Sequence, residues 1–221
     1  MRRTRRIRII TTLLIALFVI AFPVSQNVSL PSNSSSQTSE QVATALETLE
    51  NLETKGRAPK TGYERAQFGD GWRVQEGCDT RNIILARDLR DIRVGDDCKV
   101  LFGTLEDPYT GAEIRFSRGA SSSADVQIDH VVALSNAWQT GAQQLSSAMR
   151  ENLANDPLNL LAVDGKANQQ KSDGDAATWL PSNKSFRCQY VSRQLEVKSK
   201  YSLWLTGAEK DAVQKVLNSC A

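Results

Sequence analysis

The sequence has a single histidine, His130, and no two cysteines at CxxC spacing among its 221 residues. A zinc ribbon is built from paired ligands at such spacing, so this absence argues against that class of site. A single histidine also excludes metal sites that use two or more imidazoles. Because there is no second histidine and the cysteines are assigned to disulfides below, the remaining protein ligands of a metal site must be oxygen donors, such as carboxylates and amides.

A long apolar run is also missing. The chain begins with the basic stretch MRRTRRIRII, and the apolar run from Ile9 to Phe22 is shorter than the ~20 residues that cross a bilayer. A basic start before a short apolar run is typical of an export signal. Residues 1–25 are therefore predicted to be a signal peptide or, if they are not cleaved, an N-terminal anchor. Both alternatives place the rest of the chain outside the cytoplasm, and the predicted location is secreted.

Excess positive charge is absent once this segment is set aside. The 27 lysines and arginines include the five arginines of the first eight residues, so 22 remain against 25 acidic residues. Proteins that hold nucleic acid by overall charge are usually strongly basic, so phosphate contacts here must come from local groups or from a metal. The basic segment 184–200 offers Lys184 and Arg187 as candidate phosphate ligands, with a solvated surface as the alternative.

The four cysteines predict two disulfides, because thiols do not stay reduced outside the cytoplasm. Three pairings are possible. The pairs that are near in sequence, Cys78 with Cys98 and Cys188 with Cys220, are favoured. They would staple an N-terminal loop region and tie the end of the chain to the body.

The organisation along the chain is that of one domain. Residues 26–38 are rich in Ser and Asn and read as a flexible linker, and residues 39–221 can bury one core. Hydrophobic periodicity and turn signals predict elements on either side of an Asp-Pro-Tyr-Thr-Gly turn. These are a helix from residue 38 to about 56, a helix over 81–89, and strands over 99–104 and 114–117.

The segment with the clearest chemistry is the predicted strand 126–132, which carries Asp129 and His130. A lone histidine is more often structural, but its place directly after an aspartate favours catalysis. Successive strand residues point to opposite faces, so the two side chains share a site only where the strand ends. There Asp129 can hold a cation against a phosphate while neutral His130 activates a water. A helical insert over 135–155, a strand over 158–163 and a helix follow.

The order DHVV, NLLAV and KANQQKS resembles the motif of HNH, or ββα-metal, endonucleases. The resemblance implies that Asp129 and Asn168 are metal ligands and that His130 is the general base. It further implies that Asn159 braces the loop carrying the histidine, while Lys171, on the face of Asn168, is a candidate phosphate contact. The implied cofactor is a divalent metal, Mg²⁺ first and Mn²⁺ second.

Over about residues 60–205 the chain is also similar to the narrower HNH family named for the C-terminal domain of the GmrSD restriction system. The similar pieces include GYERAQFG, CDTRNIILARDL, DPYTG, IDHVVALSNAW and NQQKSDGDAATWLP. This implies an α+β fold in which a ββα-metal (HNH) nuclease core over 124–181 carries added helices and a short N-terminal sheet or loop region, stapled by disulfides. The implied activity is that of a secreted, metal-dependent endonuclease that hydrolyses phosphodiester bonds of nucleic acid, with DNA favoured.

Two other readings stay open. One is a catalytically silent extracellular module that binds nucleic acid or the cell envelope on the same fold. The other is a thiol hydrolase that pairs a cysteine with His130, which requires a free thiol.

The roles of two further residues also stay open. Arg81 could hold a phosphate or pair with Asp79 or Asp88. Tyr109 could line the cleft or pack within its turn.

Overall fold

The computed structural model describes residues 34–119 and 123–220. The predicted signal or anchor segment and the first part of the linker lie outside these residues. The first helix, α1, spans Ser34–Asn51, so residues 34–38 are helical and the linker prediction is wrong for them. Within the described ranges, no helix combines the length and the apolar character that crossing a bilayer requires.

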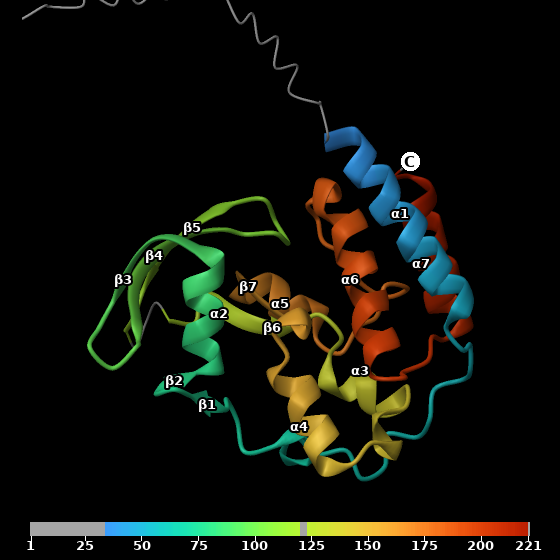
Figure 1. The fold of residues 1–221 in the computed structure, drawn as a ribbon, viewed down its shortest axis with the longest axis horizontal. Helices are drawn as coiled ribbons and strands as arrows, with labels where there is room; N and C mark the ends of the chain where they lie inside the picture. Colours follow the sequence, from blue (N-terminus) through green and yellow to red (C-terminus); the bar gives the residue numbers. More distant parts are fainter. Residues whose placement is uncertain (1–33, 120–122, 221) are drawn as a thin grey trace, which may run out of the picture. The chain divides into compact units, whose positions relative to one another are not determined.

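A layer of three helices forms one part of the fold (Figure 1). In it, α1 packs against α6 (Arg187–Lys200) and α7 (Gly207–Asn218), and α6 also packs against α7. Leu49 and Leu195 are completely buried between these helices. The disulfide Cys188–Cys220 joins the start of α6 to the chain just after α7, as predicted, so the end of the chain is tied to the body.

A second part is a three-stranded antiparallel sheet in the order β3-β4-β5, with α2 against it (Figure 1). The strand β3 was not predicted from the sequence. All its residues after Leu89 are exposed, so it lacks the apolar alternation that signals a strand. The bounds are α2 Thr80–Asp88, β3 Leu89–Val94, β4 Val100–Glu106 and β5 Glu113–Ser117.

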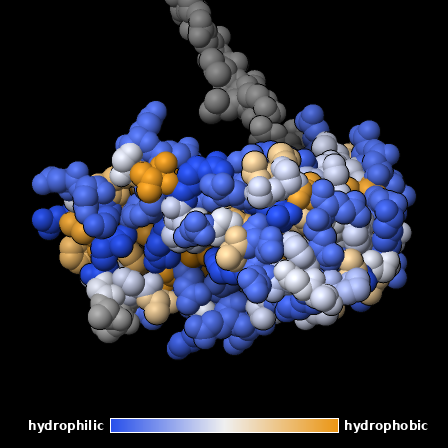
Figure 2. All heavy atoms as spheres, turned by 90° about the horizontal axis from the view of Figure 1, so that it is seen from below, coloured by the Kyte–Doolittle hydropathy of each residue, from blue (hydrophilic) through white to orange (hydrophobic). Residues whose placement is uncertain are grey.

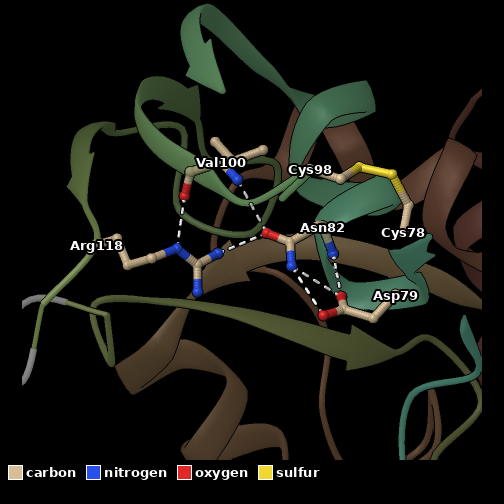
Figure 3. The surroundings of a disulfide bond; sticks show 6 residues. All are labelled: Cys78, Asp79, Asn82, Cys98, Val100 and Arg118. Atoms are coloured by element: carbon tan, nitrogen blue, oxygen red, sulfur yellow. Dashed lines mark hydrogen bonds between the residues drawn. A yellow bond between two sulfur atoms is a disulfide. The ribbon is translucent and has the colours of Figure 1, made fainter. Parts of the chain in front are cut away.

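The predicted disulfide Cys78–Cys98 joins the small hairpin of β1 (Val74–Gln75) and β2 (Cys78–Asp79) to the turn before β4. Figure 3 shows Asn82 beside it. The Asn82 side-chain oxygen accepts hydrogen bonds from the backbone N–H of Val100 at 3.0 Å and from Arg118 at 2.5 Å. The disulfide and this amide together fix α2 to the sheet.

The third part is an antiparallel pair of strands followed by a helix: β6 (Val126–His130), β7 (Leu160–Asp164) and α5 (Gly165–Lys171). Because side chains alternate, Leu160 of β7 faces the core shared with α2, and Val163 faces the core shared with α6. The chain between the strands forms two helices and short 3₁₀ turns. These are α3 Leu134–Gln139, η2 Ala142–Gln144, α4 Ser147–Asn155 and η3 Pro157–Asn159.

The turn from β7 into α5 requires glycine. A Cβ atom at Gly165 would lie 2.1 Å from the backbone oxygen of Ala124, which is far inside contact distance. The chains therefore approach so closely only because this residue has no side chain.

The surface is mostly polar. In the face drawn in Figure 2, hydrophilic and intermediate residues predominate and apolar residues occur in small groups. The large apolar side chains exposed among the described residues are Val74, Ile92, Val94, Phe102 and Met149. Three of them lie on β3 and β4.

Candidate active site

Asp129 and His130 stand at the end of β6 and border the same pocket. Their partners across the strand pair are Leu161 and Leu160, so the two side chains leave the ribbon on opposite faces. The strand ends at His130, and the chain bends away directly after it. This is the local geometry that the sequence requires if both residues are to serve one site.

The His130 imidazole is buried, and its Nε2 atom lies 2.9 Å from the backbone oxygen of Ala154. A carbonyl oxygen can only accept, so Nε2 carries the proton of the neutral ring and Nδ1 keeps its lone pair. Burial lowers the pKa of His130 to about 3, against the opposing effect of the hydrogen bond to Ala154. The ring is therefore neutral near pH 7 and can accept a proton at Nδ1.

Trp72 covers one face of this ring. The indole and imidazole planes are nearly parallel, and Trp72 itself packs against the core that α2 shares with the β6–β7 strands. The imidazole is thus held by one hydrogen bond and one aromatic stack.

The Asp129 carboxylate is buried and has two partners. The Tyr109 hydroxyl donates to Oδ2 at 2.5 Å, and the Lys171 ammonium lies 3.1 Å from Oδ1 and 3.0 Å from Oδ2. Burial raises the pKa of Asp129, and the charge of Lys171 and the bond from Tyr109 oppose the rise. Lys171 also donates to the backbone oxygen of His130 at 2.9 Å. One buried ammonium therefore holds both residues of the Asp-His pair.

Asn168 on α5 contacts Gln127, which lies two residues before Asp129 on the same face of β6. Its amide nitrogen donates to the side-chain oxygen of Gln127 at 2.8 Å. Residues two apart on a strand share a face, and so do residues three apart on a helix. Gln127 therefore contacts Asn168 in the same way that Asp129 contacts Lys171. Gln127, Asp129 and Asn168 all border the pocket with His130.

Asn159 holds the loop after His130 from both sides of its amide. Its oxygen accepts from the backbone N–H of Val132 at 2.8 Å, and its nitrogen lies 3.3 Å from the backbone oxygens of Val132 and Leu153. The side chain is completely buried. This geometry is that of a brace, and its importance for catalysis stays a prediction.

The oxygen donors at the pocket fit a hard divalent cation that keeps much of its own hydration. In the part of the chain that the structure describes, no three His, Cys, Asp or Glu side chains are grouped to hold a metal. Mg²⁺ is commonly held by one or two protein oxygens with water and phosphate oxygens, which Asp129 and Asn168 could supply. Tyr109 and Lys171 use only part of the capacity of the Asp129 carboxylate, because each oxygen has two lone pairs.

Two predicted phosphate contacts have other partners in the structure. The Lys171 ammonium is fully buried against Asp129, so the predicted contact with phosphate is wrong for this arrangement. Arg81 donates to the backbone oxygens of Val126 at 3.1 Å and Ser123 at 3.4 Å. It therefore anchors the turn before β6 and the first residue of that strand, and no ion pair joins its guanidinium to Asp79 or Asp88, the two alternative partners.

The predicted basic cluster over 184–200 is not one cationic surface. Lys184 is exposed, but Arg187 donates to the backbone oxygen of Pro181 at 2.7 Å, and neither borders the pocket. Lys198 is buried in an ion pair with Glu209 at 2.9 Å. The sequence showed charges close together in the chain but not the carbonyls and carboxylates that already bind them.

Sequence reasoning missed three residues at the site. Trp72 stacks on His130, and Lys60 and Arg65 bring positive charge to the pocket. Lys60 pairs with Asp173 at 3.1 Å, while Arg65 is exposed. All three lie well before Asp129 in the sequence, and for Arg65 and Trp72 the signal was the aromatic, glycine-rich composition of the segment Gly62–Trp72.

The cysteine alternative is contradicted. The sequence contains four cysteines, and all of them are paired in the two disulfides. A thiol hydrolase based on His130 is therefore excluded.

Comparison with known proteins gives two matches. The sequence profile of the family described as "GmrSD restriction endonucleases, C-terminal domain" matches residues 79–216, which is more than half of the chain. A protein of Arthroderma benhamiae, described as an uncharacterized secreted protein, is 37% identical over 180 residues, which cover 80% of this chain and 85% of the relative. No solved structure matches.

Proposed function

Because the chain belongs to the family of GmrSD restriction endonuclease C-terminal domains, we propose that it is a secreted, metal-dependent endonuclease of the HNH type. Its ββα core would be β6, β7 and α5. One observation carries the proposal: His130 borders the pocket with Nε2 bonded to Ala154, which leaves the lone pair of the neutral ring on Nδ1, and the oxygen donors Asp129 and Asn168 border the same pocket. A neutral base next to oxygen ligands is what hydrolysis of a phosphodiester requires.

In this mechanism His130 accepts a proton at Nδ1 from the water that attacks phosphorus. The bond from Nε2 to the Ala154 oxygen persists when the ring becomes positively charged, and a carbonyl dipole stabilises that charge. Asp129 and Asn168 would hold Mg²⁺ or, second, Mn²⁺. When bound, the cation offsets negative charge on the phosphate and on the leaving oxygen.

The remaining contacts position these groups. Lys171 and Tyr109 fix the Asp129 carboxylate, and Asn159 fixes the loop after the base. Arg65 is exposed at the pocket, so it is the side chain we assign to a phosphate of the substrate.

The proposed substrate is nucleic acid, with DNA favoured, and the proposed location is outside the cell. The basic and apolar start of the chain supports export, as do the two disulfides and the similarity to a protein described as secreted.

The test is incubation of the purified mature protein with supercoiled plasmid and with RNA, in Mg²⁺, in Mn²⁺ and in excess EDTA. We expect cleavage that depends on the cation, and a His130→Ala rate lower by ~10²–10⁴-fold. Lys215→Ala, which changes an exposed lysine on α7, is the control and should cleave at the wild-type rate. Full activity in EDTA would contradict the metal, and a wild-type rate for His130→Ala would contradict the base.

A second candidate is a catalytically silent module that binds nucleic acid outside the cell. It is favoured by one observation: the charge of Asp129 is already compensated by buried Lys171. Retained binding of plasmid without cleavage in either cation would support this alternative.

A further inference from the structure

The sheet β3-β4-β5 has one buried face and one face open to solvent. Leu89, Leu105 and Phe116 are buried against α2. Residues directly opposite each other in antiparallel strands lie on the same face. The strand register therefore places two rows on the open face, which are Arg93, Phe102 and Ser117 in one row and Arg90, Thr104 and Arg115 in the next.

Phe102 lies on the central strand β4 and is 47% exposed. Arg93 on β3 and Arg115 on β5 are both exposed, one on each side of the strand that carries Phe102. Neither arginine forms an ion pair with any other described residue. The exposed ring of Phe102 is therefore flanked by two positive charges that no ion pair with a described residue compensates.

The negative charge on the same face is compensated in part by one arginine. Arg90 lies 2.9 Å from Glu106 and 3.5 Å from Glu113, at the end of the face away from Phe102. Once the first eight residues are set aside, acidic residues outnumber basic ones in the chain. The positive charge near Phe102 is therefore a local feature of this sheet and not part of an overall positive charge.

We propose that Arg93, Phe102 and Arg115, here called the sheet face, bind an unpaired segment of nucleic acid. A base stacks on the Phe102 ring, and the two arginines contact phosphates on either side of it. Aromatic rings on a sheet bind single strands in this way because every base has a stacking surface, while cations track the backbone. The choice of nucleic acid rests on the proposed function. The sheet face would hold a single-stranded part of the substrate outside the catalytic pocket.

The test measures binding without relying on cleavage. Fluorescence anisotropy of a labelled phosphorothioate oligothymidine, with the full exported chain in EDTA, gives the affinity at several salt concentrations. Phe102→Ala should weaken binding about tenfold. Arg93→Ala and Arg115→Ala should each reduce the slope of log affinity against log salt by about 0.7.

Matched controls remove similar groups elsewhere. Met149→Ala shortens an exposed apolar side chain on α4, and Lys215→Ala removes one positive charge from α7. Both should bind as the wild type does. Circular dichroism checks that all variants keep their fold.

Unchanged affinity for Phe102→Ala together with an unchanged salt slope for both arginine variants would overturn the proposal. Self-association that Phe102→Ala abolishes, with oligothymidine binding unchanged, would also overturn it, since a second copy would then be the occupant. The outcomes separate the two proposals. If the protein cleaves plasmid but the sheet-face variants bind oligothymidine as the wild type does, only the sheet-face proposal is refuted. If these variants bind more weakly but the wild-type protein never cleaves plasmid, only the nuclease proposal is refuted.

Discussion

Trp72 lies parallel to His130, with ring centroids 5.7 Å apart and planes 13° from parallel. Together with the Ala154 oxygen on Nε2, the stack fixes both the plane of the imidazole and its rotation within that plane. A base held in this way meets its water in one orientation, so the indole is a positioning residue for the proposed reaction.

Removal of this stack should lower turnover more than substrate affinity. For Trp72→Ala we expect kcat to fall by ~10–10²-fold with little change in KM, because the base loses its orientation while the substrate contacts remain. Trp72→Phe keeps an aromatic surface and should recover most of the rate. Steady-state kinetics on a fluorogenic oligonucleotide would measure both constants. A purely structural role predicts instead that kcat is unchanged per folded molecule in both variants.

The two asparagines should respond differently to the same substitution. Asn168→Asp still supplies an oxygen, so it should keep Mn²⁺ affinity better than Asn168→Ala. Asn159→Asp loses the donors that face the Val132 and Leu153 oxygens and should impair catalysis without a matching loss of the metal. Calorimetric titration of Mn²⁺ measures the affinities. Metal loss in the Asn159 variant, with metal retained in Asn168→Ala, would reverse the assignment.

The substitution Lys171→Met should have two effects: it should lower the stability of the protein, and it should strengthen metal binding. The substitution leaves the Asp129 carboxylate buried without its counter-charge, which costs about 3–5 kcal/mol of unfolding free energy. A divalent cation can replace that charge, so Mn²⁺ should raise the Tm of the variant more than that of the wild type. Thermal unfolding with and without Mn²⁺ provides the measurement. An equal Mn²⁺ shift in both proteins would show that the cation does not bind at Asp129.

Reduction should destabilise the folded domain, and the two disulfides should contribute unequally. Cys188–Cys220 closes a longer stretch of chain than Cys78–Cys98, with sequence separations of 32 and 20. Each should contribute ~2–4 kcal/mol, slightly more for the longer loop. Urea unfolding of the Cys188→Ser/Cys220→Ser and Cys78→Ser/Cys98→Ser proteins would compare them. An unchanged midpoint after full reduction would contradict a stabilising role.

The sequence predicted the elements that have strong local patterns. The strand with Asp129 was predicted from its apolar residues and the turn into α5 from Asp164-Gly165. The two disulfide pairs were favoured among three possible pairings because their cysteines are near in sequence. The strand β3 escaped prediction because its stability comes from pairing with β4, which its own charged residues do not reveal.

At the site, the sequence indicated which residues meet but not how their hydrogen bonds are distributed. The order of Asp129, His130 and Asn168 predicted that they share a site. The contacts of Tyr109 and Lys171 with Asp129 join segments far apart in the chain, and the motif alone does not specify them. For the same reason the cationic cluster over 184–200 was misleading, since its partners lie elsewhere in the sequence.

Because His130 is the single histidine of the chain, its imidazole can be followed by spectroscopy without any label. With one histidine in the chain, nuclear magnetic resonance will show one set of imidazole signals, and no assignment is needed to identify them. The ring current of Trp72 shifts these signals away from those of a solvated histidine. Because the proton on Nε2 is bonded to Ala154 and buried, we expect it to exchange slowly enough with water to be observed. Cation or oligonucleotide that enters the pocket will therefore register directly on the ring proposed to activate the water.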